Sequence, residues 1–203
     1  MPLRNRATPL GEIVAAPGRG TLMGNRGILH DAERRVVRDW QVRRWIACRL
    51  HFRGRHRSVM TPGRYTELFF LDEAAALADG HRPCAECRHA DYRAFQAAWH
   101  SIYPHQPASA DAIDRVLHAE RRVRPFLKRT HNARIDALPD GTFIMLDGRA
   151  WLVRGGALWA WSPGAYVERI PRPVASDVSG LTPPSIVAVL RAGYQPSVHP
   201  SCQ

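Results

Sequence analysis

The Cys-x-x-Cys spacing of Cys84 and Cys87 is the feature that most constrains how this chain folds. Pro83 ends any helix that precedes the pair, so the two thiols stand on a tight turn. Such a turn presents two thiolates on one side, which is half of a tetrahedral zinc site. The alternatives are packing without a metal and a redox pair. A thioredoxin-like pair would follow a strand in a βαβ unit, and the sequence shows no such unit.

Cys48 is the expected third ligand. Apolar side chains alternate with polar ones around it, at Ile46, Cys48, Leu50 and Phe52, which predicts a strand whose apolar face carries the thiol inward. The alternative for Cys48 is a buried small hydrophobic residue, as free cysteine often is. The remaining cysteine, Cys202, lies at the extreme end of the chain.

The fourth ligand is then a histidine or an acid, and four histidines are candidates. His30 is favoured, because it lies in a glycine-containing loop that can approach the turn freely. His51 alternates to the face opposite the third cysteine. His81 and His89 lie so close to the Cys-x-x-Cys turn in sequence that they would strain the chelate.

Arginine dominates the charge of the chain. The formal net charge is +11, and residues 34 to 64 hold ten arginines against one acid. We expect a hairpin here, with strands at 45–52 and 56–60 and a turn at 53–55. A high-GC genome would also enrich arginine, and a solvated face is the plain alternative. Guanidinium groups nevertheless bind phosphate in a bidentate manner, which indicates a polyanion partner. The predicted nucleic-acid-binding residues are Arg43, Arg44, Arg49, Arg53, Arg55, Arg57 and Arg64.

The predicted fold class is α+β, in three parts. Residues 1–20 are rich in Pro, Gly and Arg, which indicates a flexible basic arm. Residues 21–137 form the zinc-binding hairpin region with short helices, one at 73–79 after the N-cap Asp72 and another after the Cys-x-x-Cys turn. Residues 138–203 form a small antiparallel β-meander, a linker at 171–180 and a closing helix with Thr182 as its N-cap.

The stretch from residue 68 to 88 resembles the zinc-binding knuckle of Ada-type DNA repair proteins. It holds an aromatic pair, a short alanine-rich helix and then Gly80, Arg82, Pro83, Cys84 and Cys87 in the family's order. The resemblance implies that Cys84 and Cys87 bind zinc and that the setting is DNA repair. Ada-type domains also carry a Cys-x-x-x-Cys pair, one thiol of which accepts a methyl group from DNA. Here Phe52 stands four residues after Cys48, so the acceptor role does not carry over. The whole chain is also similar to a family of bacterial proteins without an assigned function.

These features predict a zinc protein that binds nucleic acid, with DNA more favoured than RNA. Two alternatives stay open: an enzyme acting on nucleic acid (a nuclease, a glycosylase-like activity or a zinc-thiolate alkyl acceptor) and a protein-interaction module. No apolar stretch approaches the roughly 20 residues of a membrane span, and the N-terminus lacks the apolar core of a secretory signal. A cytoplasmic location without membrane contact is therefore expected.

Overall fold

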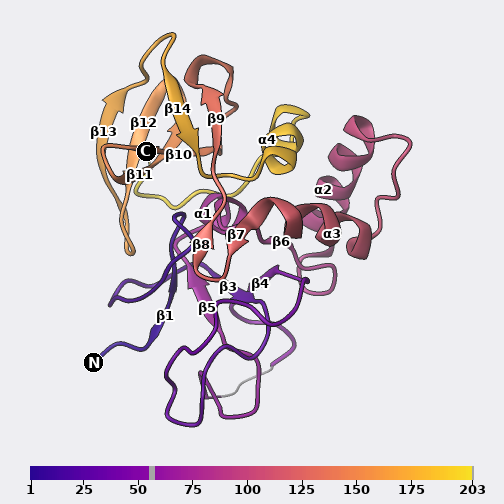
Figure 1. Ribbon diagram of the computed structural model, residues 1–203, viewed down its shortest axis with the longest axis vertical. Helices are drawn as coiled ribbons and strands as arrows, with labels where there is room; N and C mark the ends of the chain where they lie inside the picture. The colour runs from indigo at the N-terminus through magenta and orange to yellow at the C-terminus, as the bar shows by residue number, and fades with distance from the viewer. Residues whose placement is uncertain (55–57, 203) are drawn as a thin grey trace.

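The computed structural model describes residues 1–54 and 58–202. Over these residues the chain forms two six-stranded sheets, a separate two-stranded hairpin and four α-helices (Figure 1). This mixture of helices and mainly antiparallel strands confirms the predicted α+β class.

The first sheet is built from the N-terminal 83 residues. Its strands run in the spatial order β2-β1-β5-β3-β4-β6. They are β1 (Arg4–Ala7), β2 (Ile13–Ala15), β3 (Leu22–Asn25), β4 (Ile46–Arg49), β5 (Leu68–Phe70) and β6 (Arg82–Pro83). β3 pairs in antiparallel fashion with β4 and β5, whereas the short β6 adds to β4 in parallel.

The expectation of a loose arm over residues 1–20 is wrong. β1 pairs with β2 and also, in parallel, with β5, so the N-terminus is one side of the sheet. Ala7 and Ile13 from these strands are buried, and Arg4 Nε donates a hydrogen bond of 2.7 Å to the carbonyl of Ile13. The Pro and Gly content marks the turns between the strands and not disorder.

The predicted arginine hairpin is also wrong. β4 lies between β3 and β6, so its neighbours in the sheet are these two strands and not the segment that follows it in sequence. Residues 58–60, in the second half of the expected hairpin, lie in a turn. Arg55 and Arg57, which were predicted to bind nucleic acid, lie outside the described residues. Local alternation predicted the strand, but the choice of its partners depended on segments distant in sequence.

A buried alanine-rich helix, α1 (Glu73–Ala78), joins the two sheets (Figure 1). As predicted, Asp72 caps it, accepting a hydrogen bond of 2.9 Å from the N–H of Ala75, and Gly80 follows it with a φ of +92°. All six helical residues are buried. Ala76 packs against the first sheet, whereas Ala74 and Ala75 pack with residues of the second. Small side chains let both sheets approach the helix closely.

The second sheet has the order β13-β12-β11-β10-β14-β9. Its strands are β9 (His131–Arg134), β10 (Phe143–Leu146), β11 (Arg149–Arg154), β12 (Ala157–Trp161), β13 (Tyr166–Pro171) and β14 (Asp177–Gly180). The predicted meander corresponds to β10–β13. The sheet begins at His131, before the predicted boundary at 138, and the expected linker at 171–180 contributes β14. Strands that are distant in sequence again pair, since β14 lies between β10 and β9.

The other elements cover one side of the two sheets. They are α2 (His89–Ile102), α3 (Ala110–Arg121), the hairpin β7 (Arg122–Arg124) and β8 (Leu127–Lys128), and α4 (Pro184–Arg191). The closing helix begins after Pro183; the expected cap, Thr182, instead accepts a hydrogen bond of 2.8 Å from the N–H of Phe143. None of the described helices combines the length and the hydropathy needed to cross a membrane.

Candidate metal centre

Three cysteine side chains meet at the edge of the first sheet. The sulfurs of Cys48, Cys84 and Cys87 all lie within 4.8 Å of one another. β4 supplies the first, and the turn after β6 supplies the other two. All three are buried, with Met23, Ile46 and Phe52 packed against them. The structure therefore brings together the three predicted cysteine ligands.

Main-chain pairing holds the turn against the strand. Ala47 lies opposite Pro83, and the N–H of Cys84 donates a hydrogen bond of 3.0 Å to the carbonyl of Ala47. The turn closes through the N–H of Arg88, which donates to the carbonyl of Cys84 over 3.1 Å. These main-chain hydrogen bonds hold the turn against β4 and do not involve the sulfur atoms.

The electrostatics of the group favour thiolates. A hydrogen bond from the thiol of Cys48 is the main cause that lowers the pKa of Cys84 to about 5, with help from the N–H groups of Cys87 and Glu86. The same thiol is the main cause that lowers the pKa of Cys87. Because Cys48 donates to both sulfurs, its own pKa is raised. A divalent cation would take the place of this last proton.

The donor set suits zinc. Tetrahedral zinc with bonds of about 2.3 Å separates its sulfur ligands by about 3.8 Å, which the 4.8 Å limit accommodates. Thiolates select soft or borderline metals over magnesium and calcium. Among the residues that the structure describes, this is the one group of three or more metal-ligating side chains close enough to share an ion.

His30 does not complete the group, and this prediction is wrong. Its Nδ1 lies 2.6 Å from Thr66 Oγ1 and its Nε2 lies 3.2 Å from the carbonyl of Thr61, so both ring nitrogens have partners in a segment more than 30 residues away. His30 therefore ties its loop to residues 61–66 and is not part of the cysteine group.

The other three candidate histidines lie in three different environments. His81 is fully buried between Trp45 and Phe70, with ring centroids 5.1 and 4.7 Å away. His89 lies at the start of α2, where its Nδ1 is 3.1 Å from the carbonyl of Ala85. His51 lines the same cavity as the three cysteines. The sequence disfavoured His51 as a ligand because continued strand alternation would place it on the face opposite Cys48. The strand β4 ends at Arg49, before His51, so the alternation does not extend to it.

The cavity beside the cysteines has a volume of about 650 Å³. Aromatic rings of Phe52, Tyr65 and Phe69 contribute to its walls. Arginines and carboxylates, which sequence analysis did not connect with the cysteines, also line it: Arg49, Arg64, Glu67 and Glu86. A volume of this size is typical of small-molecule sites.

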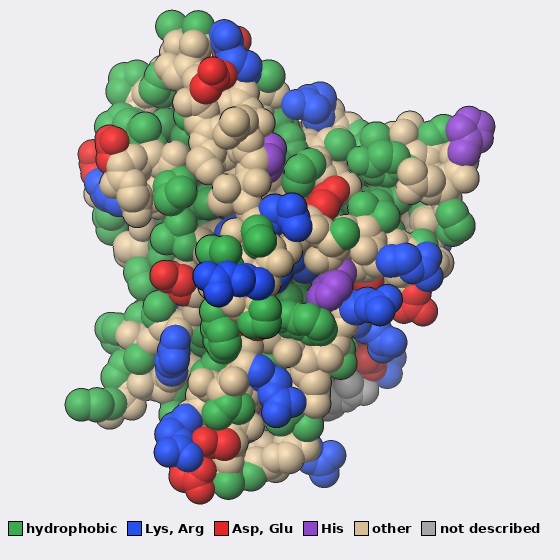
Figure 2. All heavy atoms as spheres, viewed as in Figure 1, with side chains coloured by type: hydrophobic (Ala, Val, Ile, Leu, Met, Phe, Trp, Pro, Cys, Tyr) green, Lys and Arg blue, Asp and Glu red, His purple; other side chains and the backbone are tan. Residues whose placement is uncertain are grey.

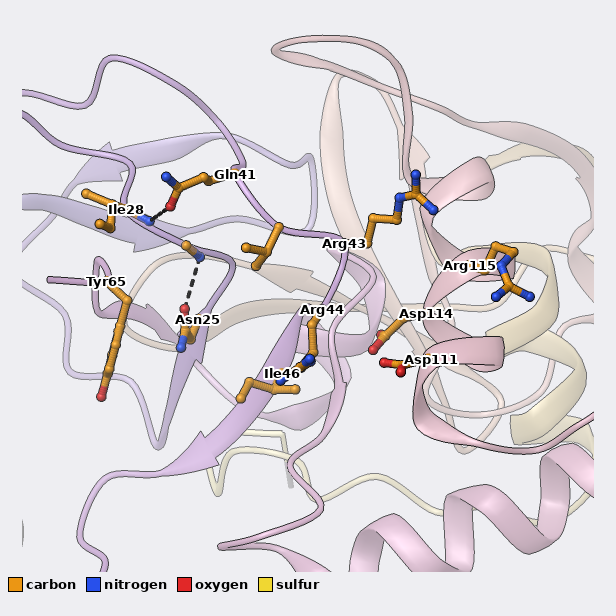
Figure 3. Close-up of a pocket in the computed structure, with 12 residues that line it drawn as sticks. Asn25, Ile28, Gln41, Arg43, Arg44, Ile46, Tyr65, Asp111, Asp114 and Arg115 are labelled. Atoms are coloured by element: carbon orange, nitrogen blue, oxygen red, sulfur yellow. Dashed lines mark hydrogen bonds between the residues drawn. The ribbon is translucent and has the colours of Figure 1, made fainter.

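The predicted nucleic-acid-binding arginines that the structure describes are all exposed: Arg43, Arg44, Arg49, Arg53 and Arg64. Four of the five line one of two cavities. Arg49 and Arg64 line the cysteine cavity, whereas Arg43 and Arg44 line a second cavity of about 670 Å³. Figure 3 shows this second cavity, with Asn25, Gln41 and Tyr65 on one side and Asp111, Asp114 and Arg115 of α3 on the other.

Other arginines have a structural role that the sequence did not reveal. Five of them are buried: Arg26, Arg82, Arg88, Arg121 and Arg122. Arg26 and Arg122 pair with Asp79, over 2.7 and 3.5 Å, and both guanidinium groups lie over the ring of Trp45. The high arginine content thus serves the core as well as the surface.

Comparison of the chain with protein-family models, with curated proteins and with solved structures finds no match. The function therefore has to follow from the chemistry of the residues. Three buried thiols, two of them with a lowered pKa, form a group that could hold a metal ion, and the exposed arginines beside it make a surface suited to anions.

Proposed function

We propose that this chain is a cytoplasmic zinc protein that binds nucleic acid, and DNA in particular, through the arginines around its metal centre. The observation that carries the proposal is the three-thiol group in the wall of a cavity that Arg49 and Arg64 also line. Zinc held by Cys48, Cys84 and Cys87 would cross-link β4 to the turn. Structural zinc contributes roughly 10 kcal/mol or more of apparent binding free energy in small domains.

The geometry connects the metal to the proposed binding surface. Arg49 is the residue after Cys48 in β4, and its main-chain N–H donates a hydrogen bond of 3.4 Å to Cys87 Sγ. A metal at the sulfurs would therefore hold the backbone that presents this guanidinium group. The net charge of +11 adds the long-range attraction that a polyanion partner requires.

The resemblance to the Ada-type knuckle supports a setting in DNA repair or defence. Cys48 is 8% exposed, which favours a structural ligand over a nucleophile that a bulky phosphotriester must reach. Phe52 packs against the three cysteines, at the spacing where the Ada-type pattern has its second thiol. We therefore propose that Cys48 is structural in this chain.

The test combines metal analysis with electrophoretic mobility shifts on single-stranded and duplex DNA at several salt concentrations. One zinc per chain and a log–log salt slope of roughly −4 to −7, for five to eight phosphates neutralised, are expected. A protein purified without metal, or binding that does not respond to salt, would refute the corresponding half of the proposal.

An enzyme acting on nucleic acid is the second candidate. The observation in its favour is that the cysteines open onto a cavity that also contains Glu67 and Glu86. Catalytic zinc sites keep a coordination position for water or substrate, and a carboxylate is a common general base. Cleavage products on the same gels, or a mass gain of about 14 Da on Cys48 after incubation with methylphosphotriester DNA, would favour this candidate.

A further inference from the structure

The β7–β8 hairpin reverses the usual placement of polar and apolar side chains. Two of its three basic residues, Arg122 and Lys128, point into the protein, where the first is 8% exposed, whereas Arg124 is exposed. Its apolar residues point outward: Val123 is 56% exposed, Phe126 60% and Leu127 43%. Burying a guanidinium group is costly unless it is paired, and Arg122 is paired with the carboxylates of Asp39 and Asp79.

The inward side chains clamp the hairpin to the body of the protein. Arg122 donates a hydrogen bond of 2.9 Å to the carbonyl of Gly11 and lies 3.1 Å from the carboxylate of Asp39. Lys128 Nζ donates to the carbonyl of Ala78 over 2.6 Å. The hairpin is therefore held by bonds to three separate segments, and its apolar tip projects from this attachment.

Phe126 forms the tip with a left-handed backbone. Its φ is +60°, a region that glycine and asparagine favour and a bulky residue rarely adopts. The main-chain N–H of Phe126 donates a hydrogen bond of 2.9 Å to Asp39 Oδ2, which holds this conformation. An exposed aromatic ring kept on a strained turn is typical of a contact residue, because strain of this kind concentrates at binding sites.

The surroundings of the tip are basic. Arg124 and Arg129 of the hairpin segment are exposed, and residues 121–129 hold no acid. Through Asp39 the tip adjoins the loop of residues 37–44, which contributes exposed Arg38 and Arg43. Figure 2 shows hydrophobic side chains gathered in the middle of this face with basic side chains around them.

We propose that the β7–β8 hairpin is a base-stacking element, in which the ring of Phe126 stacks on an unpaired base of a nucleic acid while Arg124 and Arg129 contact the adjacent phosphates. The inference rests on the proposed function and adds that the part of the nucleic acid recognised here is an unpaired base. Charge complementarity selects this occupant, because aromatic residues flanked by cations are how proteins bind single-stranded or unstacked nucleic acid.

The test measures binding of the full chain to a single-stranded oligonucleotide that carries 2-aminopurine and to the fully paired duplex of the same sequence. Phe126→Ala is expected to weaken binding to the single strand by about 5- to 150-fold with an unchanged salt slope, since each stacked base is worth this much. Phe126→Trp should retain affinity and quench 2-aminopurine fluorescence. Phe126→Gly, which also relieves the positive φ, should bind as weakly as Phe126→Ala. The matched control is Val167→Ala on β13, where an equally exposed apolar side chain is removed.

The outcomes separate the two proposals. If the wild-type protein binds neither oligonucleotide, the proposed function fails and this inference fails with it. If it binds with the expected salt slope and Phe126→Ala binds equally well, the stacking element alone is refuted. Self-association in sedimentation, or binding to anionic vesicles, that is lost in Phe126→Ala while oligonucleotide binding stays intact would likewise overturn it.

Discussion

The main-chain N–H of Arg49 points at the sulfur of Cys87, 3.4 Å away. This contact joins the end of β4 to the Cys-x-x-Cys turn across 38 residues of sequence. An N–H donor stabilises a thiolate more than a thiol, so the contact prepares the sulfur for a cation. It also links the metal centre directly to a residue of the proposed binding surface.

Removal of one cysteine ligand tests the metal centre. Cys84→Ser is expected to lower bound zinc from one per chain to substoichiometric amounts and to lower the melting temperature markedly, because structural zinc contributes directly to folding. The measurements are elemental analysis and thermal unfolding with and without chelator. Cys202→Ser is the control, since Cys202 is buried in a different cluster and should leave the zinc content unchanged.

His30→Ala tests the revised ligand set. The zinc content should stay at one per chain, because both ring nitrogens of His30 bond to residues of the 61–66 segment. Stability should fall by about 1–3 kcal/mol, because the substitution removes two hydrogen bonds that are each worth about 0.5–1.5 kcal/mol. Elemental analysis and urea unfolding measure the two effects. Loss of zinc, with the fall in melting temperature expected for Cys84→Ser, would show that His30 is a ligand after all.

Neutralisation of exposed arginines tests the nucleic-acid surface. Arg49→Gln and Arg64→Gln should each reduce the magnitude of the log–log salt slope on duplex DNA by about 0.9, since each removes one phosphate contact. The loss should be similar for unrelated DNA sequences. Arg169→Gln on β13 removes an exposed arginine from the other sheet and should leave the slope as it is.

The buried pair of Arg26 and Asp79 gives a prediction about stability. Both side chains are fully buried and 2.7 Å apart. Asp79→Asn should destabilise the fold by about 3–5 kcal/mol, because it leaves the guanidinium group of Arg26 without its counter-ion. Asp136→Asn breaks a pair with Arg134 in which both side chains are more than half exposed, and should leave the stability nearly unchanged because solvent screens the pair. Urea unfolding compares the two variants.

His81 gives a pH dependence. Burial is the main cause that lowers its pKa well below the ordinary value of 6.5, and the neighbouring cations lower it further. Below about pH 6.5 His81 is protonated in the unfolded chain but stays neutral in the folded protein. The free energy of unfolding therefore falls as the pH drops through this value. His81→Gln should flatten the dependence between pH 5 and 7.5 in urea unfolding. His105→Gln, an exposed substitution, should leave it unchanged.

Local signals in the sequence predicted many elements correctly. Asp72 and Gly80 mark the two ends of α1, and the Asp-Gly and Gly-Gly turns separate the strands of the meander. These features depend on backbone preferences within a few residues, which a single sequence displays directly. The choice of strand partners does not, which is why the arginine hairpin and the loose N-terminal arm were predicted wrongly.

The sequence by itself determined which side chains are candidate metal ligands: Cys84 and Cys87 are placed on one turn by their spacing, and Cys48 is turned inward by strand alternation. Only the tertiary structure decided what surrounds them. The pairing of β4 with β6 closes the three-thiol group, and the hydrogen bonds of His30 remove it from the ligands. The tertiary structure also decided the environment of each arginine. Whether a guanidinium group is buried against Asp79 or exposed to a partner depends on contacts between distant segments, and composition cannot encode these contacts.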